Sequence, residues 1–168
     1  ETFRGCQSLR SLKIPSTVKF IGEGSFWGCI RLMSMEICEG IEEIGESAFR
    51  ECEHLQSIKI PSTVRVIGGC AFRLCRQLVD VELCEGLEFI EDSAFSSCSS
   101  LRRIRIPSSV EVMGVVVFVH CTKLVEVELC EGLETIGLQM FTCCRSLHRM
   151  KIPSSVKKIE SSAFQHCF

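Results

Sequence analysis

The chain has 168 residues, of which 46% are apolar and 24% are charged, and its formal net charge is −2. This composition is typical of one ordered globular domain and excludes an intrinsically disordered chain. The near-neutral charge offers no overall attraction to nucleic acid, and no apolar run reaches the roughly 18 residues of a membrane-spanning helix, so we expect no nucleic-acid partner and no direct membrane insertion.

A single pattern recurs every 23 residues along the whole chain, without insertion or deletion. Phenylalanine marks it at eight places: Phe3, Phe26, Phe49, Phe72, Phe95, Phe118, Phe141 and Phe164. A fixed period of about 20 to 50 residues is typical of solenoid proteins, because each unit has an apolar face that only a neighbouring copy can cover. We predict a single array of seven full units over residues 1–168. The sequence begins and ends inside a unit, so we expect the array to be part of a longer chain.

Each unit contains three predicted segments. In residues 48–55 the apolar side chains are spaced 1, 3 and 3 apart, which predicts one or two helical turns. Ile58 and Ile60 then predict a strand with one buried face, and Val64 and Ile67 a shorter second strand. Identical strands one period apart must pair in parallel. We therefore expect an α/β solenoid: a right-handed coil with a parallel sheet on one side, a second short strand per unit, and short helical or 3₁₀ turns on the other side.

Two kinds of unit alternate, so the true sequence repeat is 46 residues. One kind ends its first strand in Ile-Pro-Ser, at Pro15, Pro61, Pro107 and Pro153. The other has Cys-Glu-Gly at that place, beginning at Cys38, Cys84 and Cys130. Proline has no N–H to donate to a sheet, which suits the end of a strand.

The chain contains 13 cysteines, and eight of them follow the 23-residue period: Cys6, Cys29, Cys52, Cys75, Cys98, Cys121, Cys144 and Cys167. In stacked units their Cβ vectors run parallel, which is poor geometry for a disulfide. We interpret this column as small thiols that fill one core position per unit.

These units resemble the BspA-like class of leucine-rich repeat, whose pattern is L-x-x-I-x-[IL]-P-x-x-[VL]-x-x-I-G-x-x-A-F-x-x-C. The resemblance covers the whole chain. It implies a leucine-rich-repeat fold, and because the family includes surface adhesins, matrix-binding proteins and scaffolds, it also implies a binding role whose partner the fold does not specify.

The exposed position of the first strand alternates in charge sign along the array: Lys13, Glu36, Lys59, Glu82, Arg105, Glu128 and Lys151. In register, each charge lies between two opposite ones, and each pair contributes about 0.2 to 1 kcal/mol. A shift by one unit would bring like charges together, so we interpret this concave charge ladder as a structural device that fixes the register. The alternative is a face that binds a charged partner, but a self-neutralised surface has little net potential.

Three further features are candidate sites. Val115, Val116, Val119 and Leu138 replace polar residues of other units, and exposed contiguous apolar side chains predict a partner-binding surface. His120, Cys143 and His166 share one column and are a weak candidate for zinc, without an obvious fourth ligand. Glu88, Glu111 and Glu134 form an acidic strip that could hold a basic peptide or Ca²⁺, or simply be solvated.

The sequence predicts no enzyme and no cofactor, because an active site needs a unique constellation and nearly all the His and Ser residues lie in repeat register. Our first hypothesis is a non-catalytic protein-binding or scaffolding module. The alternatives are a structural subunit or stalk that continues its sheet into a neighbouring subunit, and a cell-surface adhesin-like module.

Overall fold

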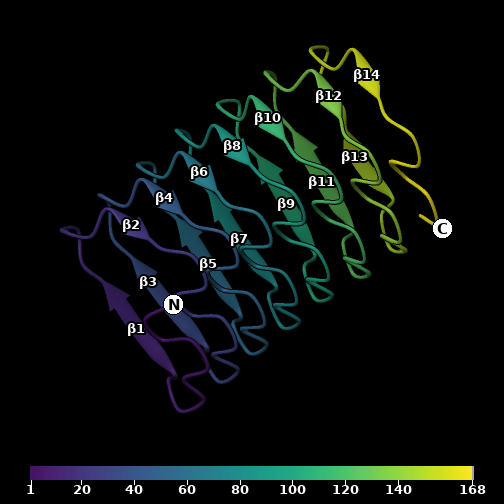
Figure 1. Ribbon diagram of the computed structural model, residues 1–168. Helices are drawn as coiled ribbons and strands as arrows, with labels where there is room; N and C mark the ends of the chain where they lie inside the picture. The colour runs from purple at the N-terminus through teal and green to yellow at the C-terminus, as the bar shows by residue number, and fades with distance from the viewer. Residues whose placement is uncertain (168) are drawn as a thin grey trace.

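The computed structural model describes residues 1–167, which form one continuous stack of coils with two strands in each coil (Figure 1). The longer strands are β1 (Ser11–Ile14), β3 (Ser34–Ile37), β5 (Ser57–Ile60), β7 (Asp80–Leu83), β9 (Arg103–Ile106), β11 (Glu126–Leu129) and β13 (Arg149–Lys151). The shorter strands are β2 (Phe20–Ile21), β4 (Glu43–Ile44), β6 (Val66–Ile67), β8 (Phe89–Ile90), β10 (Val112–Met113), β12 (Thr135–Ile136) and β14 (Lys158–Ile159). The ends of the described chain lie at opposite ends of the stack (Figure 1).

All strand pairs are parallel and join residues 23 positions apart, as the repeat predicts. In the first sheet, the hydrogen-bonded ladder runs through β1, β3, β5 and β7 and, after a break, through β9, β11 and β13. The second sheet joins β2 to β10, and a separate pair joins β12 and β14. Ile58 and Ile60 are buried and Lys59 is exposed, which confirms the predicted inward and outward faces of the first strand.

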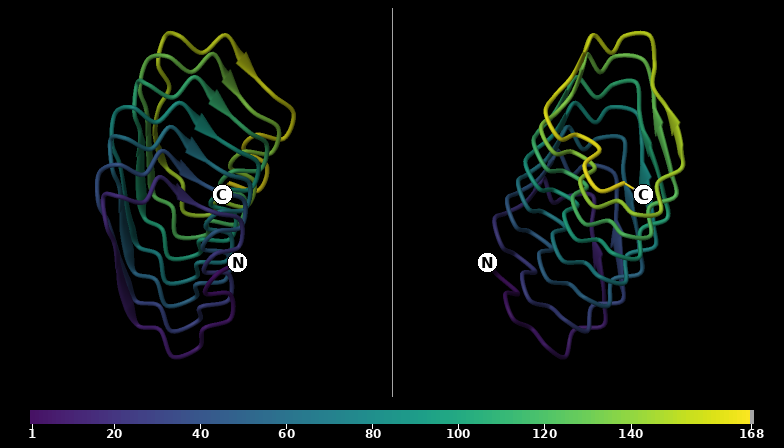
Figure 2. Two further views of the ribbon diagram at one scale, coloured as in Figure 1. Left: turned by 60° about the vertical axis from the view of Figure 1, so that its left-hand side comes forward. Right: turned by 90° about the vertical axis from the view of Figure 1, so that its right-hand side faces the viewer.

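The side of each coil across from the first sheet consists of tight turns, so the predicted helical segment is wrong (Figure 2). Residues 1–167 contain no α-helix and no 3₁₀-helix. In the coil of Phe49, the amides of Arg50 and Cys52 bond three residues back within the coil, whereas those of Phe49 and Glu51 bond to Ala71 and Arg73 of the next coil. A helix would keep all of these bonds inside one coil.

The backbone conformation explains why these turns do not continue as a helix. Two positions of each turn segment have a positive φ, and in most coils they carry residues other than glycine. Ser47 and Glu51, for example, have φ of 54° and 62°. The left-handed conformation ends a helical turn after three or four residues and redirects the next N–H toward the neighbouring coil.

The core is built from columns of identical side chains, one from each coil. Successive phenylalanine rings stack with centroids 5.1 to 5.6 Å apart and with planes 4° to 8° from parallel. Beside them, the six central cysteines of the periodic column are buried, which confirms their predicted core position. All 13 cysteines are free thiols.

The alternation of the two kinds of coil has a structural basis that the sequence analysis missed. The Pro-Ser turn of one coil lies between a glutamate of the preceding coil and a glycine of the following coil. Glu39 accepts hydrogen bonds from the backbone N–H groups of Ser62 and Thr63 and from the Ser62 hydroxyl, at 3.1 to 3.4 Å. On the other side, a Cβ on Gly86 would collide with the Ser62 carbonyl oxygen, and Gly86 has a φ of 110°.

The same glutamate contact, here called the glutamate clamp, recurs at Glu85 with Ser108 and Ser109 and at Glu131 with Ser154 and Ser155. It joins a Cys-Glu-Gly coil to the Pro-Ser coil that follows. The break between β7 and β9 falls at such a junction, and only one residue pair is bridged between β3 and β5. The clamps of Glu39 and Glu85 therefore tie coils together where the first sheet is least continuous.

Candidate functional site

The predicted charge ladder lies on the outward face of the first sheet, and its residues face one another in register. Lys13 pairs with Glu36 at 2.5 Å and Lys59 with Glu82 at 2.6 Å. Farther along, Glu128 lies 3.7 Å from both Arg105 and Lys151. All of these side chains are exposed, so each pair contributes little to stability on its own. The opposite charges offset one another and leave this face without a dominant sign.

The acidic strip predicted on the second sheet is largely neutralised. Arg65 lies 2.6 Å from Glu88, and Lys157 lies 2.5 Å from Glu134. The hydrogen bond from Arg65 to Glu88 also raises the pKa of the guanidinium. The strip therefore has less free negative charge than its sequence indicates.

The predicted apolar patch divides into an exposed and a half-buried part. Val115 and Leu138 are 38% and 41% exposed, whereas Val116 and Val119 are half-buried. Val116 donates its backbone N–H to the Leu138 carbonyl at 3.0 Å, which places the two coils side by side. Val115 and Leu138 are the two members of the set that present a substantial surface to the solvent.

His120, Cys143 and His166 lie at equivalent positions of successive turn segments, each with a positive φ. Backbone hydrogen bonds join these coils, from His120 to Thr142 and from Cys143 to Gln165. Within residues 1–167, no group of three or more His, Cys, Asp or Glu side chains is placed to hold a metal ion. In that range, nothing forms a helix long and apolar enough to cross a membrane.

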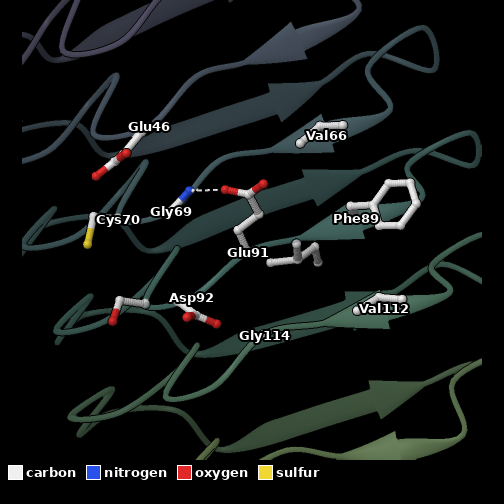
Figure 3. Close-up of a pocket in the computed structure, with 11 residues that line it drawn as sticks. Glu46, Val66, Gly69, Cys70, Phe89, Glu91, Asp92, Val112 and Gly114 are labelled. Atoms are coloured by element: carbon white, nitrogen blue, oxygen red, sulfur yellow. Dashed lines mark hydrogen bonds between the residues drawn. The ribbon is translucent and has the colours of Figure 1, made fainter.

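The structure has a groove over the second sheet that the sequence analysis did not identify. It is an open hollow with a volume of about 660 Å³ over β6, β8 and β10 (Figure 3). Its first row of side chains is apolar and consists of Val66, Phe89 and Val112, which are register partners on neighbouring strands. Phe89 is 37% exposed and Val112 is 52% exposed, so this row presents apolar surface to the solvent.

A second row runs beside the first and is formed by Glu46, Gly69 and Asp92, with Glu91 between the two rows (Figure 3). A Cβ at Gly69 would lie 3.5 to 4.0 Å from the Asp92 carbonyl oxygen, a Glu91 carboxylate oxygen and the Glu46 side chain. Glu91 accepts a hydrogen bond from the Gly69 N–H at 2.8 Å, which holds its carboxylate over Gly69. The apolar row therefore faces a row of carboxylates across the groove.

The acidic residues of the groove are not neutralised by neighbours. Glu46, Glu91 and Asp92 are all exposed, and no basic side chain among residues 1–167 pairs with any of them. Asp92 accepts the Val115 N–H at 2.8 Å, so Val115, in the exposed part of the predicted apolar patch, lies beside the groove.

A signal for this groove was present in the sequence. Five of the seven units have glycine immediately after the second strand, and glutamate replaces it in the other two, as Glu91 and Glu160. Gly69 in turn replaces the polar residue found at the next position in neighbouring units, Glu46 and Asp92. Reading the departures from the repeat, in addition to the repeat itself, would have identified the groove.

Solved structures of leucine-rich repeat proteins resemble this chain. The T. pallidum leucine-rich repeat protein TpLRR is 28% identical, with a TM-score of 0.86 over 90% of this chain and 73% of its own. A leucine-rich cell surface protein of Faecalibacterium prausnitzii is 25% identical, with a TM-score of 0.55 over 99% of this chain and 53% of its own. The pneumococcal vaccine antigen PcpA is 22% identical, with a TM-score of 0.65 over 87% of this chain and 51% of its own, and it supports the fold alone.

This chain thus spans about half the length of the second and third of these proteins. No curated protein matches it in sequence. The family described as the BspA type leucine-rich repeat region matches residues 1–102 and 42–168 in six copies, which together cover the whole sequence. The parallel stack, the 23-residue period and this match agree, and the chain belongs to the BspA-type leucine-rich repeat family.

Proposed function

We propose that the chain is a non-catalytic protein-binding repeat module that holds its partner in the groove over β6, β8 and β10. The observation that carries this proposal is the uniqueness of the groove within a regular array. Features that stabilise the stack recur in every coil or in every second coil, as the glutamate clamps do. Gly69 is the only glycine at its place in the repeat, and it lies next to Glu91, beside an exposed apolar row. Glutamate recurs at the place of Glu91 only as Glu160, which pairs with Lys158 at 2.5 Å.

The proposed contact surface includes the exposed patch beside the groove. Val115 is joined to Asp92 by a hydrogen bond, and Leu138 follows it on the next coil. Exposed apolar side chains that lie together on a folded protein are typical of interaction surfaces, and repeat arrays bind partners through extended faces of this kind.

Site-specific photo-crosslinking tests this assignment. A photoreactive phenylalanine analogue replaces Val112 in the groove or, as the matched control, Arg103 on the outward face of the first sheet. Irradiation in an extract of the source organism should give protein adducts from position 112 and few from position 103. Adducts from position 103 alone, or from neither position, would contradict the proposed surface.

The similarity to a cell surface protein favours a second candidate, a module carried outside the cell with the same groove facing its surroundings. An antibody against the chain should then stain intact cells of the source organism as strongly as permeabilised cells. Staining that requires permeabilisation would exclude this candidate.

A third arrangement, a structural subunit or stalk, predicts association through the end coils. Size-exclusion chromatography of the chain over a wide concentration range should then show growing assemblies. An unchanging monomer would count against it and leave the binding module unaffected.

A further inference from the structure

The two rows of the groove run side by side, as the two rows of side chains on an extended peptide do. Neighbouring coils of a parallel sheet are about 4.8 Å apart, so the apolar row spans roughly 10 Å from Val66 to Val112. About three residues of extended chain, at roughly 3.3 Å each, cover that distance. A peptide lying between the rows, parallel to the axis of the stack, would send alternate side chains toward Phe89 and toward the carboxylates.

The charge of the groove selects among possible peptides. Its lining contains three carboxylates, from Glu46, Glu91 and Asp92, and no basic side chain. The smaller hollows over the first sheet differ, because Glu126 and Glu128 share one with Arg149 and Lys151. A partner with lysine or arginine toward the acidic row would gain charge complementarity in the groove that the first sheet does not offer.

A metal ion does not account for these carboxylates as well as a peptide does. No three acidic groups within residues 1–167 converge at a distance suited to a cation. Two of the carboxylates are instead held apart by backbone hydrogen bonds, Glu91 by Gly69 and Asp92 by Val115. The exposed ring of Phe89 and the side chain of Val112 also offer apolar contacts that a peptide side chain can make and an ion cannot.

We infer that the groove binds an extended segment of a partner protein in which basic and apolar residues alternate. This inference rests on the proposed binding function and adds the chemistry of the partner. Over the roughly 10 Å of the rows, one or two apolar side chains of the segment would lie on Val66, Phe89 and Val112, and one or two basic side chains would face Glu46, Glu91 and Asp92. Because the carboxylates are exposed, binding should weaken as the salt concentration rises.

Fluorescence anisotropy tests the inference with a labelled peptide, Lys-Val-Lys-Phe-Lys-Val-Lys, titrated with the whole chain. The peptide should bind, and the analogue with glutamate in place of lysine should not. Glu91→Gln should weaken binding about two- to fivefold, and adding Asp92→Asn should weaken it about tenfold in total, since each exposed ion pair is worth up to about 1 kcal/mol. Both substitutions keep an oxygen that accepts the existing backbone hydrogen bond.

Glu36→Gln on the first sheet is the matched control, because it removes the same charge from an exposed strand position. It should leave the affinity unchanged. A Phe89→Ser variant, shown to be folded by circular dichroism, should also bind the peptide more weakly.

Equal losses in Glu36→Gln and Glu91→Gln would overturn the inference, because attraction would then depend on overall charge. Failure of the basic peptide to bind, or displacement of the peptide by Ca²⁺ alone, would overturn it as well. If the peptide fails but position 112 still gives crosslinks, the binding function stands and only the partner chemistry is wrong.

Discussion

At the scale of single residues, the cysteine column shows why one residue type recurs in every coil. Each thiol of the column after Cys6 donates a hydrogen bond to the carbonyl oxygen of the phenylalanine 26 positions earlier, at 3.0 to 3.2 Å. That carbonyl already accepts an N–H within its own turn, as Phe72 does from Cys75. Cysteine is small and apolar and carries a weak donor, so it fills the core while it satisfies a second lone pair.

This burial predicts which thiols react. Burial raises the pKa of Cys121 to about 12 and raises that of Cys98 well above its usual range, which suppresses the reactive thiolate. Iodoacetamide should therefore leave Cys98 and Cys121 unmodified in the folded protein while it labels half-buried Cys130. Peptide mass spectrometry after a short exposure measures the difference, and labelling in urea provides the fully reactive control. Rapid labelling of Cys98 without denaturant would contradict the packing described here.

At the scale of elements, the glutamate clamp links stability to pH. Partial burial by itself would raise the pKa of Glu85, but hydrogen bonds from the backbone and hydroxyl groups of Ser108 and Ser109 outweigh it, and the pKa falls below its usual range. The pKa of Glu131 is also lowered, chiefly by the backbone N–H of Ser154. A carboxyl with a lower pKa in the folded state stabilises that state when ionised and loses this effect on protonation.

The clamps should therefore weaken in acid. Their contribution is complete above the unfolded-chain pKa of about 4.3 and is lost as the pH falls through the lower folded-state values. Urea midpoints measured from neutral to acidic pH should decline, and the decline should be smaller in Glu85→Gln, which lacks one of these carboxyls at every pH. Parallel profiles for the variant and the wild-type chain would show that this clamp does not contribute.

Glycine substitutions test the other side of the Pro-Ser turn. Gly86→Ala should cost about 3 kcal/mol or more, because the new Cβ meets the Ser62 carbonyl and the backbone has a φ that alanine disfavours. Gly69→Ala is the matched control, since the nearest atom to its Cβ would be 3.5 Å away and its φ is not positive. Equilibrium unfolding in urea gives both values. Equal stability of the two variants would argue against the close approach at Gly86.

At the scale of the whole molecule, the alternation of the two kinds of coil implies that coils can be removed without a large loss of stability only two at a time. Deleting residues 57–102 removes two coils and brings Glu36 beside Arg105 and Glu39 beside the Ser108 turn. Deleting residues 57–79 removes one coil and brings Glu36 beside Glu82, with no serine turn for Glu39 to clamp. The variant that keeps more of the chain should therefore be the less stable one.

Urea unfolding of the two deletion variants measures this directly. The two-coil deletion should unfold in one transition close to that of the intact chain, because every remaining junction is of a kind already present. The one-coil deletion should unfold at a clearly lower urea concentration. The reverse order would mean that the glutamate clamps and the charge ladder do not select the partner coil.

Most of the architecture could be predicted from the sequence, because the period of 23 residues fixes the register of every strand. The turn segment could not. The spacing of Ala48, Phe49 and Cys52 fits a helical face, but the decisive feature is the left-handed backbone at Ser47 and Glu51, which neither residue type indicates. Hydrogen bonding to adjacent coils stabilises that conformation, and this tertiary effect is not visible in one unit.

The candidate site was harder to predict for a related reason. The apolar residue Val115 indicated the region beside the groove. The groove itself depends on two departures from the repeat on neighbouring coils, Gly69 and Glu91. Each is unremarkable alone, and only stacking brings Gly69, which has no side chain, beside the carboxylate of Glu91. The acidic strip of Glu88 and Glu134 failed as a guide because its compensating cations, Arg65 and Lys157, come from adjacent coils.

The hydrogen bonds between coils, in the turn segments as well as in the sheets, run along the axis of the stack. Tension applied along the axis of the stack would pull along the direction of those bonds, and a coil held on one side only would yield before a coil held on both sides. The array would then unravel one coil at a time. Each step would release 23 residues, which is roughly 80 Å of extended polypeptide, so the array would act as an extensible tether that lengthens in equal increments under load.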